Sequence, residues 1–230
     1  MSSGDRGGAA VRPGLRCGGA AGQVLVIAKE PVPGKVKTRL TPPFSPPDAA
    51  LLAAASLADT LQAVAKAPSA RRVLALEGAP GPWLPDGFTV LRQRGQGLDE
   101  RLAAAFDDAY RLLHAPIVLI GMDTPQVTAE MLSTALSLLG TWDAVFGPAA
   151  DGGFWLLGLR VPDPGLLLGV PMSQPYTGDA QLARLAGAGL SIARMPRLTD
   201  VDTVADAVEV AAEAPESRFA EALAGLWALR

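Results

Sequence analysis

Short apolar runs rich in β-branched residues alternate with longer segments of helical periodicity along most of the chain. The first such run is VLVIA, which begins at Val24 and is followed by a segment punctuated by proline and glycine. Runs of this length predict buried strands, whereas apolar positions three or four residues apart predict the helices that cover them. The predicted strands are 24–28, 71–78, 88–93, 115–121, 142–147, 154–160 and 190–195, and the predicted helices are 48–66, 100–114, 128–139, 177–187 and those after about 203.

This alternation predicts the α/β fold class: a single domain with a mostly parallel twisted sheet and helices on both faces. The strands at 142–147 and 154–160 have no helix between them, so they predict a small antiparallel insertion. Residues 1–22 are rich in Gly, Ala and Arg without periodicity, and they predict a disordered tail before a domain that spans 23–230.

Composition narrows the classes of function. The chain has 230 residues, a formal net charge of −3, one cysteine (Cys17) and one histidine (His114). A single cysteine excludes an intrachain disulfide and Cys-based zinc cages, and it fits a reducing cytoplasm. The net negative charge argues against a binder of nucleic-acid phosphates, and no stretch reaches the ~18 apolar residues of a membrane span. We therefore expect a cytoplasmic protein with no nucleic-acid partner and no membrane span, and the oligomeric state stays open.

The segment KEPVPGKVKTRL follows the first predicted strand and concentrates positive charge. Ligands of open α/β sheets bind beyond the carboxyl ends of the strands, where this segment lies. A glycine lets the backbone approach an anion closely, and ammonium and guanidinium groups around it can bind a phosphate or pyrophosphate. The segment lacks the glycine and Ser/Thr positions of an ATPase P-loop, and its structural alternative is a solvated basic loop. The candidate phosphate-binding residues are Lys29, Gly34, Lys35, Lys37 and Arg39.

Acidic residues follow three later strand candidates. Asp123 comes directly after an apolar run, where a carboxylate can ligate Mg²⁺ or Mn²⁺, or else cap the next helix. Asp200 and Asp202 are two residues apart, so on an extended segment both can face one cation, although Asp202 or Thr203 can instead cap the final helices. Asp151 precedes a glycine pair that either admits a ligand or makes a turn.

Taken together and in this order, the segments AKEPVPGKVKTRL, RGQGLDERL, GMDTP, GPAADGGFWLLGL and TDVDT resemble a bacterial family of glycosyltransferases. That family has the nucleotide-diphospho-sugar transferase (GT-A-like) fold, is often encoded beside radical-SAM enzymes, and in some cases is assigned to arsenosugar assembly. The resemblance covers about residues 23–210. A more remote similarity extends to molybdopterin and phospholactate guanylyltransferases, which share the basic first loop and a mid-chain metal aspartate.

The resemblance implies a role for each matched residue. Asp123 would be the metal aspartate and Asp202 a second ligand of Mg²⁺ or Mn²⁺, with Asp200 as a less direct companion. Asp151 would be the catalytic carboxylate on the acceptor side. The matched glycine, hydroxyl and basic positions would hold the nucleotide; these are Gly34, Lys37, Thr38, Arg39, Gly97 and Arg101.

The sequence thus predicts a metal-dependent glycosyltransferase that moves a sugar from a nucleotide-diphosphate sugar to a small acceptor. One alternative is a nucleotidyltransferase, in which a phosphorylated acceptor attacks an NTP and pyrophosphate leaves. Another is a non-catalytic regulator that binds a nucleotide. The expected partners are a nucleotide-sugar donor or an NTP and a small-molecule acceptor. Phe154 departs from the aromatic residue usual in the family's DGG motif, and Met172-Ser173 departs from the pair expected near the acceptor pocket, so the acceptor stays open. The sequence names neither the base nor the sugar.

Overall fold

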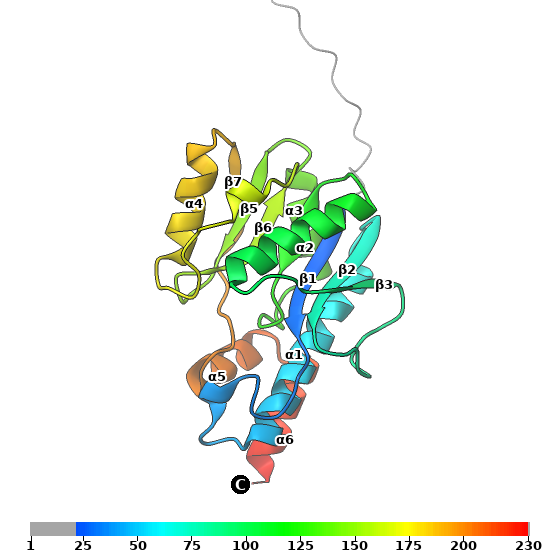
Figure 1. Ribbon diagram of the computed structural model, residues 1–230. Helices are drawn as coiled ribbons and strands as arrows, with labels where there is room; N and C mark the ends of the chain where they lie inside the picture. Colours follow the sequence, from blue (N-terminus) through cyan, green and yellow to red (C-terminus); the bar gives the residue numbers. More distant parts are fainter. Residues whose placement is uncertain (1–21, 230) are drawn as a thin grey trace, which may run out of the picture.

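The structure, a computed structural model, describes residues 22–229, and its elements largely follow the predicted ones (Figure 1). The strands are β1 (Gln23–Lys29), β2 (Arg71–Glu77), β3 (Phe88–Arg92), β4 (Ile117–Ile120), β5 (Ala144–Pro148), β6 (Phe154–Leu159) and β7 (Ile192–Arg194). The helices are α1 (Pro46–Lys66), α2 (Leu98–Leu112), α3 (Ala129–Leu138), α4 (Thr177–Gly187), α5 (Val204–Glu213) and α6 (Arg218–Ala228). Two short 3-10 turns lie at Thr38–Leu40 and Pro164–Leu166.

The strands form one sheet in the order β3-β2-β1-β4-β6-β5-β7. The pairs β1–β2, β1–β4, β2–β3 and β5–β7 are parallel, and β6 runs antiparallel to both of its neighbours, β4 and β5. The predicted α/β class, with a mostly parallel sheet and a small antiparallel element, is confirmed. Because β6 is reversed, it begins at the same edge of the sheet at which β1 and β4 end.

Helices cover both faces of the sheet, with α2 and α4 on one side and α1 and α3 on the other (Figure 1). The strand β4 shows why its sequence is continuously apolar. Val118 and Ile120 join the core under α1 and α3, whereas Ile117 and Leu119 join the core under α2. A strand buried on both faces needs apolar side chains at every position rather than at alternate ones.

A third core cluster lies beyond the sheet edge, between α1, α5 and α6 (Figure 1). Leu40 and Phe44 of the first loop pack there with Val201 of the TDVDT segment, and all three are almost completely buried. This cluster brings the basic loop and the late acidic segment together, although they lie at opposite ends of the sequence. Within the described residues, α1 is the one helix long and apolar enough by composition to cross a membrane, and much of it is buried inside this fold.

Local signals decide where α1 begins. Ser45 is the N-cap, and its hydroxyl accepts a hydrogen bond from the Asp48 N–H, while the Asp48 side chain accepts one from the Ser45 N–H. This capping box places Asp48, the first residue of the predicted helix, three positions after the N-cap. The predicted tail lies outside the described residues except for Gly22, whose carbonyl accepts a hydrogen bond from the Ala70 N–H at 2.8 Å.

Candidate active site

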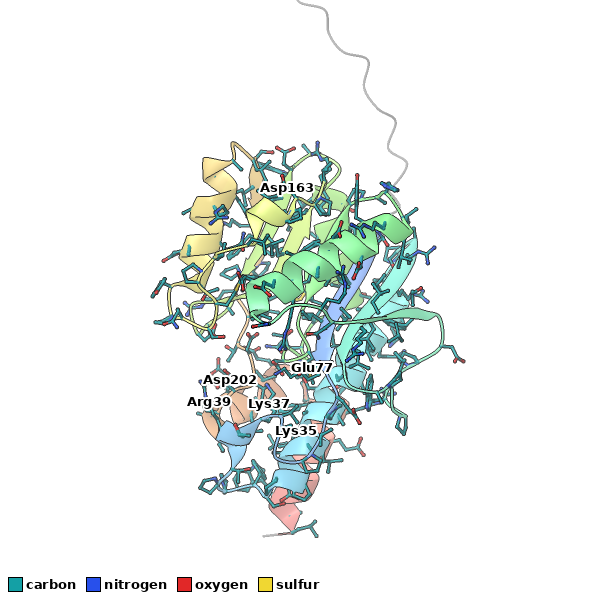
Figure 2. All side chains as sticks on the ribbon, in the orientation of Figure 1. Lys35, Lys37, Arg39, Glu77, Asp163 and Asp202 are labelled. Atoms are coloured by element: carbon teal, nitrogen blue, oxygen red, sulfur yellow. The ribbon has the colours of Figure 1, made fainter. Side chains whose placement is uncertain are left out.

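An open cavity of about 690 Å³ lies at the carboxyl ends of β1 and β4. The first loop, the start of α2, the residues after β4, the β5–β6 loop, the segment before α4 and the TDVDT segment all contribute to its lining. In Figure 2 the labelled side chains of Lys35, Lys37, Arg39 and Asp202 gather at this edge, whereas Asp163 lies at the opposite end of the sheet. The cavity therefore lies where ligands of α/β sheets bind.

All but two of the predicted site residues line this cavity. Gly34 is outside the lining and adopts a left-handed conformation (φ +77°) with open space where a Cβ would stand, so its role is to make the turn of the loop. Gly97 is also outside and is the N-cap of α2. The predicted residues that line the cavity are Lys29, Lys35, Lys37, Thr38, Arg39, Arg101, Asp123, Asp151, Asp200 and Asp202.

Lys37 lies at the centre of the charged groups. Its backbone is left-handed (φ 48°, ψ 38°), a conformation uncommon for a residue with a side chain, and its side chain is only 6% exposed. The Nζ atom lies 2.6 Å from Asp123 Oδ1 and 3.7 Å from Asp202 Oδ1, and it also donates to the Val201 carbonyl. In the structure this ammonium lies between two carboxylates, and its predicted role in binding a phosphate stays a prediction.

Neither of these carboxylates serves as a helix cap. Thr128 caps α3 through its side chain, and Thr203 caps α5 in a capping box with Asp206. The Asp123 and Asp202 side chains are each 40% exposed and are paired with Lys37. The TDVDT segment is held in place because the Val201 N–H donates to the Asp123 carbonyl at 2.9 Å.

Asp200 has the most perturbed ionisation in the cavity. Burial above all, and then the negative charges of Asp123 and Asp151, raise the pKa of its carboxyl to about 7, while the Lys37 ammonium opposes this rise. A carboxyl with this pKa changes its charge near neutral pH. Perturbed acids of this kind are typical of functional sites, where like charges are held close together.

Asp151 belongs to the loop between β5 and β6, and its Oδ1 accepts a hydrogen bond from the Gly153 N–H at 2.8 Å. Gly152 has φ +90°, and a Cβ there would collide with the carbonyl of Pro175. The Gly178 N–H donates to the Gly152 carbonyl at 2.8 Å, which ties the loop to the start of α4. The glycine pair therefore allows a close backbone approach that fixes where Asp151 stands.

A divalent cation fits the donor set of this cavity, although no ready-made cage is present. Within residues 22–229, no three His, Cys, Asp or Glu side chains converge as a metal site, so Asp123, Asp200 and Asp202 do not form one by themselves. Asp123 and Asp202 do approach the same ammonium nitrogen. Mg²⁺ is commonly held by one or two carboxylates together with substrate phosphates and water. Asp123 and Asp202 are the residues that would hold it.

Glu77, at the end of β2, was missed in the sequence. Its Oε2 lies 2.6 Å from Arg101 Nη1 and 3.6 Å from Lys29 Nζ, so it orders two of the predicted cations. Its place at the carboxyl end of a predicted strand was the available signal. Lys35, by contrast, forms no ion pair with an acid of the described chain.

The sequence is similar to a family of bacterial proteins and to a named enzyme. The pattern of the family described as "Uncharacterized protein conserved in bacteria (DUF2064)" matches residues 58–174. The chain is also 34% identical, over 207 residues, to a 3-phospho-D-glycerate guanylyltransferase of Phenylobacterium zucineum (strain HLK1), covering 83% of this chain and 90% of that protein. The chain belongs to the DUF2064 family.

This DUF2064 protein is similar to solved structures as well. A crystal structure from Desulfovibrio desulfuricans G20, provisionally named a nucleotide-diphospho-sugar transferase, matches with a TM-score of 0.75 and 30% identity over 81% of this chain and 84% of that one. The 2-C-methyl-D-erythritol 4-phosphate cytidylyltransferase of Thermus thermophilus matches with a TM-score of 0.51 and 16% identity over 83% and 97%, and it shows the fold alone. The predicted nucleotide-diphospho-sugar transferase fold is confirmed. The expected links to radical-SAM enzymes and arsenosugars stay predictions.

Proposed function

We propose that this DUF2064 protein is a guanylyltransferase that transfers GMP from GTP to a small phosphorylated acceptor and releases pyrophosphate. The observation that supports this most directly is the 34% identity to a 3-phospho-D-glycerate guanylyltransferase over 83% of the chain. It favours the nucleotidyltransferase alternative over the glycosyltransferase that we preferred from the sequence. The acceptor class we propose is a phosphorylated small acid such as 3-phospho-D-glycerate.

In this reaction a phosphate oxygen of the acceptor forms a bond to the α-phosphorus of GTP. The bond from that phosphorus to the bridging oxygen of pyrophosphate breaks, and pyrophosphate takes the electron pair. Lys35 and Arg39 line the cavity and would bind the phosphates that leave. A divalent cation held by Asp123 and Asp202 would supply electrostatic stabilisation of the charge on the phosphates.

A phosphorylated acceptor needs no general base, because a phosphate monoester is largely ionised at neutral pH. The Asp151 carboxylate would then position the acceptor side of the cavity through its loop rather than remove a proton. Glycosyl transfer to a hydroxyl would instead require a base, and Asp151 is our candidate for it. The likeness to the Desulfovibrio desulfuricans protein, at 30% identity, keeps glycosyl transfer as a second candidate.

The two reactions differ in their products. In the first assay, purified protein is incubated with GTP, 3-phospho-D-glycerate and Mg²⁺ or Mn²⁺, and the release of pyrophosphate is measured. In the second assay, nucleotide sugars replace GTP, and the release of free nucleoside diphosphate is measured. We expect the wild-type protein to release pyrophosphate from GTP and Asp123→Asn to lose most of this turnover. Asp86→Asn, which changes an exposed carboxylate outside the cavity, is the control and should keep it. Turnover of nucleotide sugars alone, without pyrophosphate from any NTP, would contradict the proposal.

A further inference from the structure

Apolar side chains line part of the cavity. Ile27, Leu98 and Leu102 line it, and the Leu98 side chain, on the first turn of α2, is 42% exposed. Gln93, the residue after β3, lines the same cavity. An apolar wall with a few fixed polar groups is the usual composition of a site that orients a heteroaromatic ligand.

The side-chain amide of Gln93 is held in one orientation. Its Nε2 donates to the carbonyl of Ala28 at 2.7 Å and to the carbonyl of Ala75 at 3.0 Å. Turning the amide by half a rotation would place Oε1 against two carbonyl oxygens, neither of which can donate a hydrogen bond. Both amide N–H groups are therefore engaged by the sheet, and Oε1 accepts no hydrogen bond from the described residues.

Glu77, an acidic residue at the end of the neighbouring strand β2, is already paired with other side chains. Its carboxylate is paired with Arg101 and Lys29, and it does not line the cavity. Gln93 lines the same cavity as these apolar side chains, and its Oε1 is a hydrogen-bond acceptor whose orientation is set by carbonyls of β1 and β2.

We propose that Gln93 selects guanine as the base of the donor, an inference that rests on the guanylyl transfer proposed above. Guanine presents two adjacent donors, N1–H and the 2-amino group, to a fixed acceptor. Adenine and cytosine present one donor, their amino group, beside an unprotonated ring nitrogen, so the same acceptor gains one hydrogen bond and also faces a lone pair. An amide that could rotate would pair equally well with either pattern, whereas one held by two backbone carbonyls offers only its oxygen, which pairs best with the two adjacent donors of guanine.

The test measures the dissociation constants of the full chain for GTP, ITP, ATP and CTP with Mg²⁺ by titration calorimetry. In the wild-type protein we expect GTP to bind about 10–100-fold more tightly than ATP or CTP, because the wrong base leaves a polar group unpaired. ITP, which lacks the 2-amino group but keeps N1–H, should fall between them.

The variant Gln93→Met keeps the length of the side chain and removes the acceptor, so the preference for GTP over ATP should fall to within about threefold. Gln62→Met, on α1 and outside the cavity, is the matched control and should keep the wild-type ratio. Gln93→Met also loses two hydrogen bonds to the sheet, so its pyrophosphate affinity, expected to be unchanged, reports whether the phosphate half of the site is intact.

The measured affinities separate the role of Gln93 from the proposed function. Equal affinities of the wild-type protein for the four nucleotides, or an unchanged GTP to ATP ratio in a folded Gln93→Met variant, would overturn the role of Gln93 and leave nucleotidyl transfer standing. Failure of the wild-type protein to bind any of the nucleotides would overturn the proposed function together with the inference.

Discussion

Replacing Asp200 by Asn should make the metal-free protein more stable, and the gain should depend on pH. The Asp200 carboxyl is partly buried beside other acids, and its pKa is raised from 3.8 to about 7. In the unfolded chain the carboxyl ionises near its ordinary value, so folding disfavours the charged form. The contribution of Asp200 to wild-type stability therefore falls as the pH rises from about 4 to about 7 and is constant above that window. Asn has a similar shape and cannot ionise.

The size of the effect follows from the shift in pKa. A change of one in pKa is worth about 1.4 kcal/mol, so a rise from 3.8 to about 7 corresponds to an upper limit of about 4 kcal/mol. Solvent reaches part of this side chain, which reduces the penalty. We expect Asp200→Asn to be about 2–3 kcal/mol more stable than wild type at pH 8, and to show little difference at pH 4.

Urea unfolding followed by tryptophan fluorescence, in EDTA and at several pH values, measures this difference; the buried Trp155 is a suitable probe. Asp86→Asn, an exposed carboxylate, is the control and should show no trend with pH. A stability difference between Asp200→Asn and wild type that stays flat from pH 4 to pH 8 would refute the reasoning. So would a variant that is less stable than wild type at pH 8.

Four further substitutions test the same cavity and the loop beside it. Lys37→Met removes the cation between two carboxylates, so it should destabilise the protein at neutral pH. Mg²⁺ alone should raise the melting temperature of this variant more than that of wild type. Equal responses to Mg²⁺ would contradict the role of Lys37 as the counter-charge of these carboxylates. Asp123→Asn and Asp202→Asn should each weaken Mn²⁺-dependent GTP affinity by about tenfold or more, measured by calorimetry, and an unchanged response removes that residue from the metal site. Gly152→Ala places a Cβ against a backbone carbonyl at φ +90° and should lower the free energy of unfolding in urea by about 2–4 kcal/mol. Gly225→Ala, which has open space in α6, is the control and should be neutral or stabilising. Similar effects of the two substitutions would contradict the packing argument.

Local sequence patterns were sufficient for most elements of the fold. The strand β4 was recognisable because burial on both faces demands a continuous apolar run, and the sheet edge that carries ligands follows from strands that alternate with helices. The helix predicted from Asp48 begins at Pro46 instead. Ser45 and Asp48 hydrogen-bond to each other's backbone N–H groups, and the backbone conformation makes Ser45 the N-cap.

Hydrophobic periodicity and the charge of each loop are local properties, so they were enough to predict the α/β fold and the main segments that meet at the cavity. The pairing of charged and polar groups in the cavity depends instead on the three-dimensional packing. Lys37 meets Asp123 and Asp202 because the third core cluster joins the first loop to the TDVDT segment. Gln93 has a fixed acceptor because two neighbouring strands offer carbonyls to its Nε2. Such pairings depend on distances between residues remote in the chain, and no pattern of neighbouring residues encodes them.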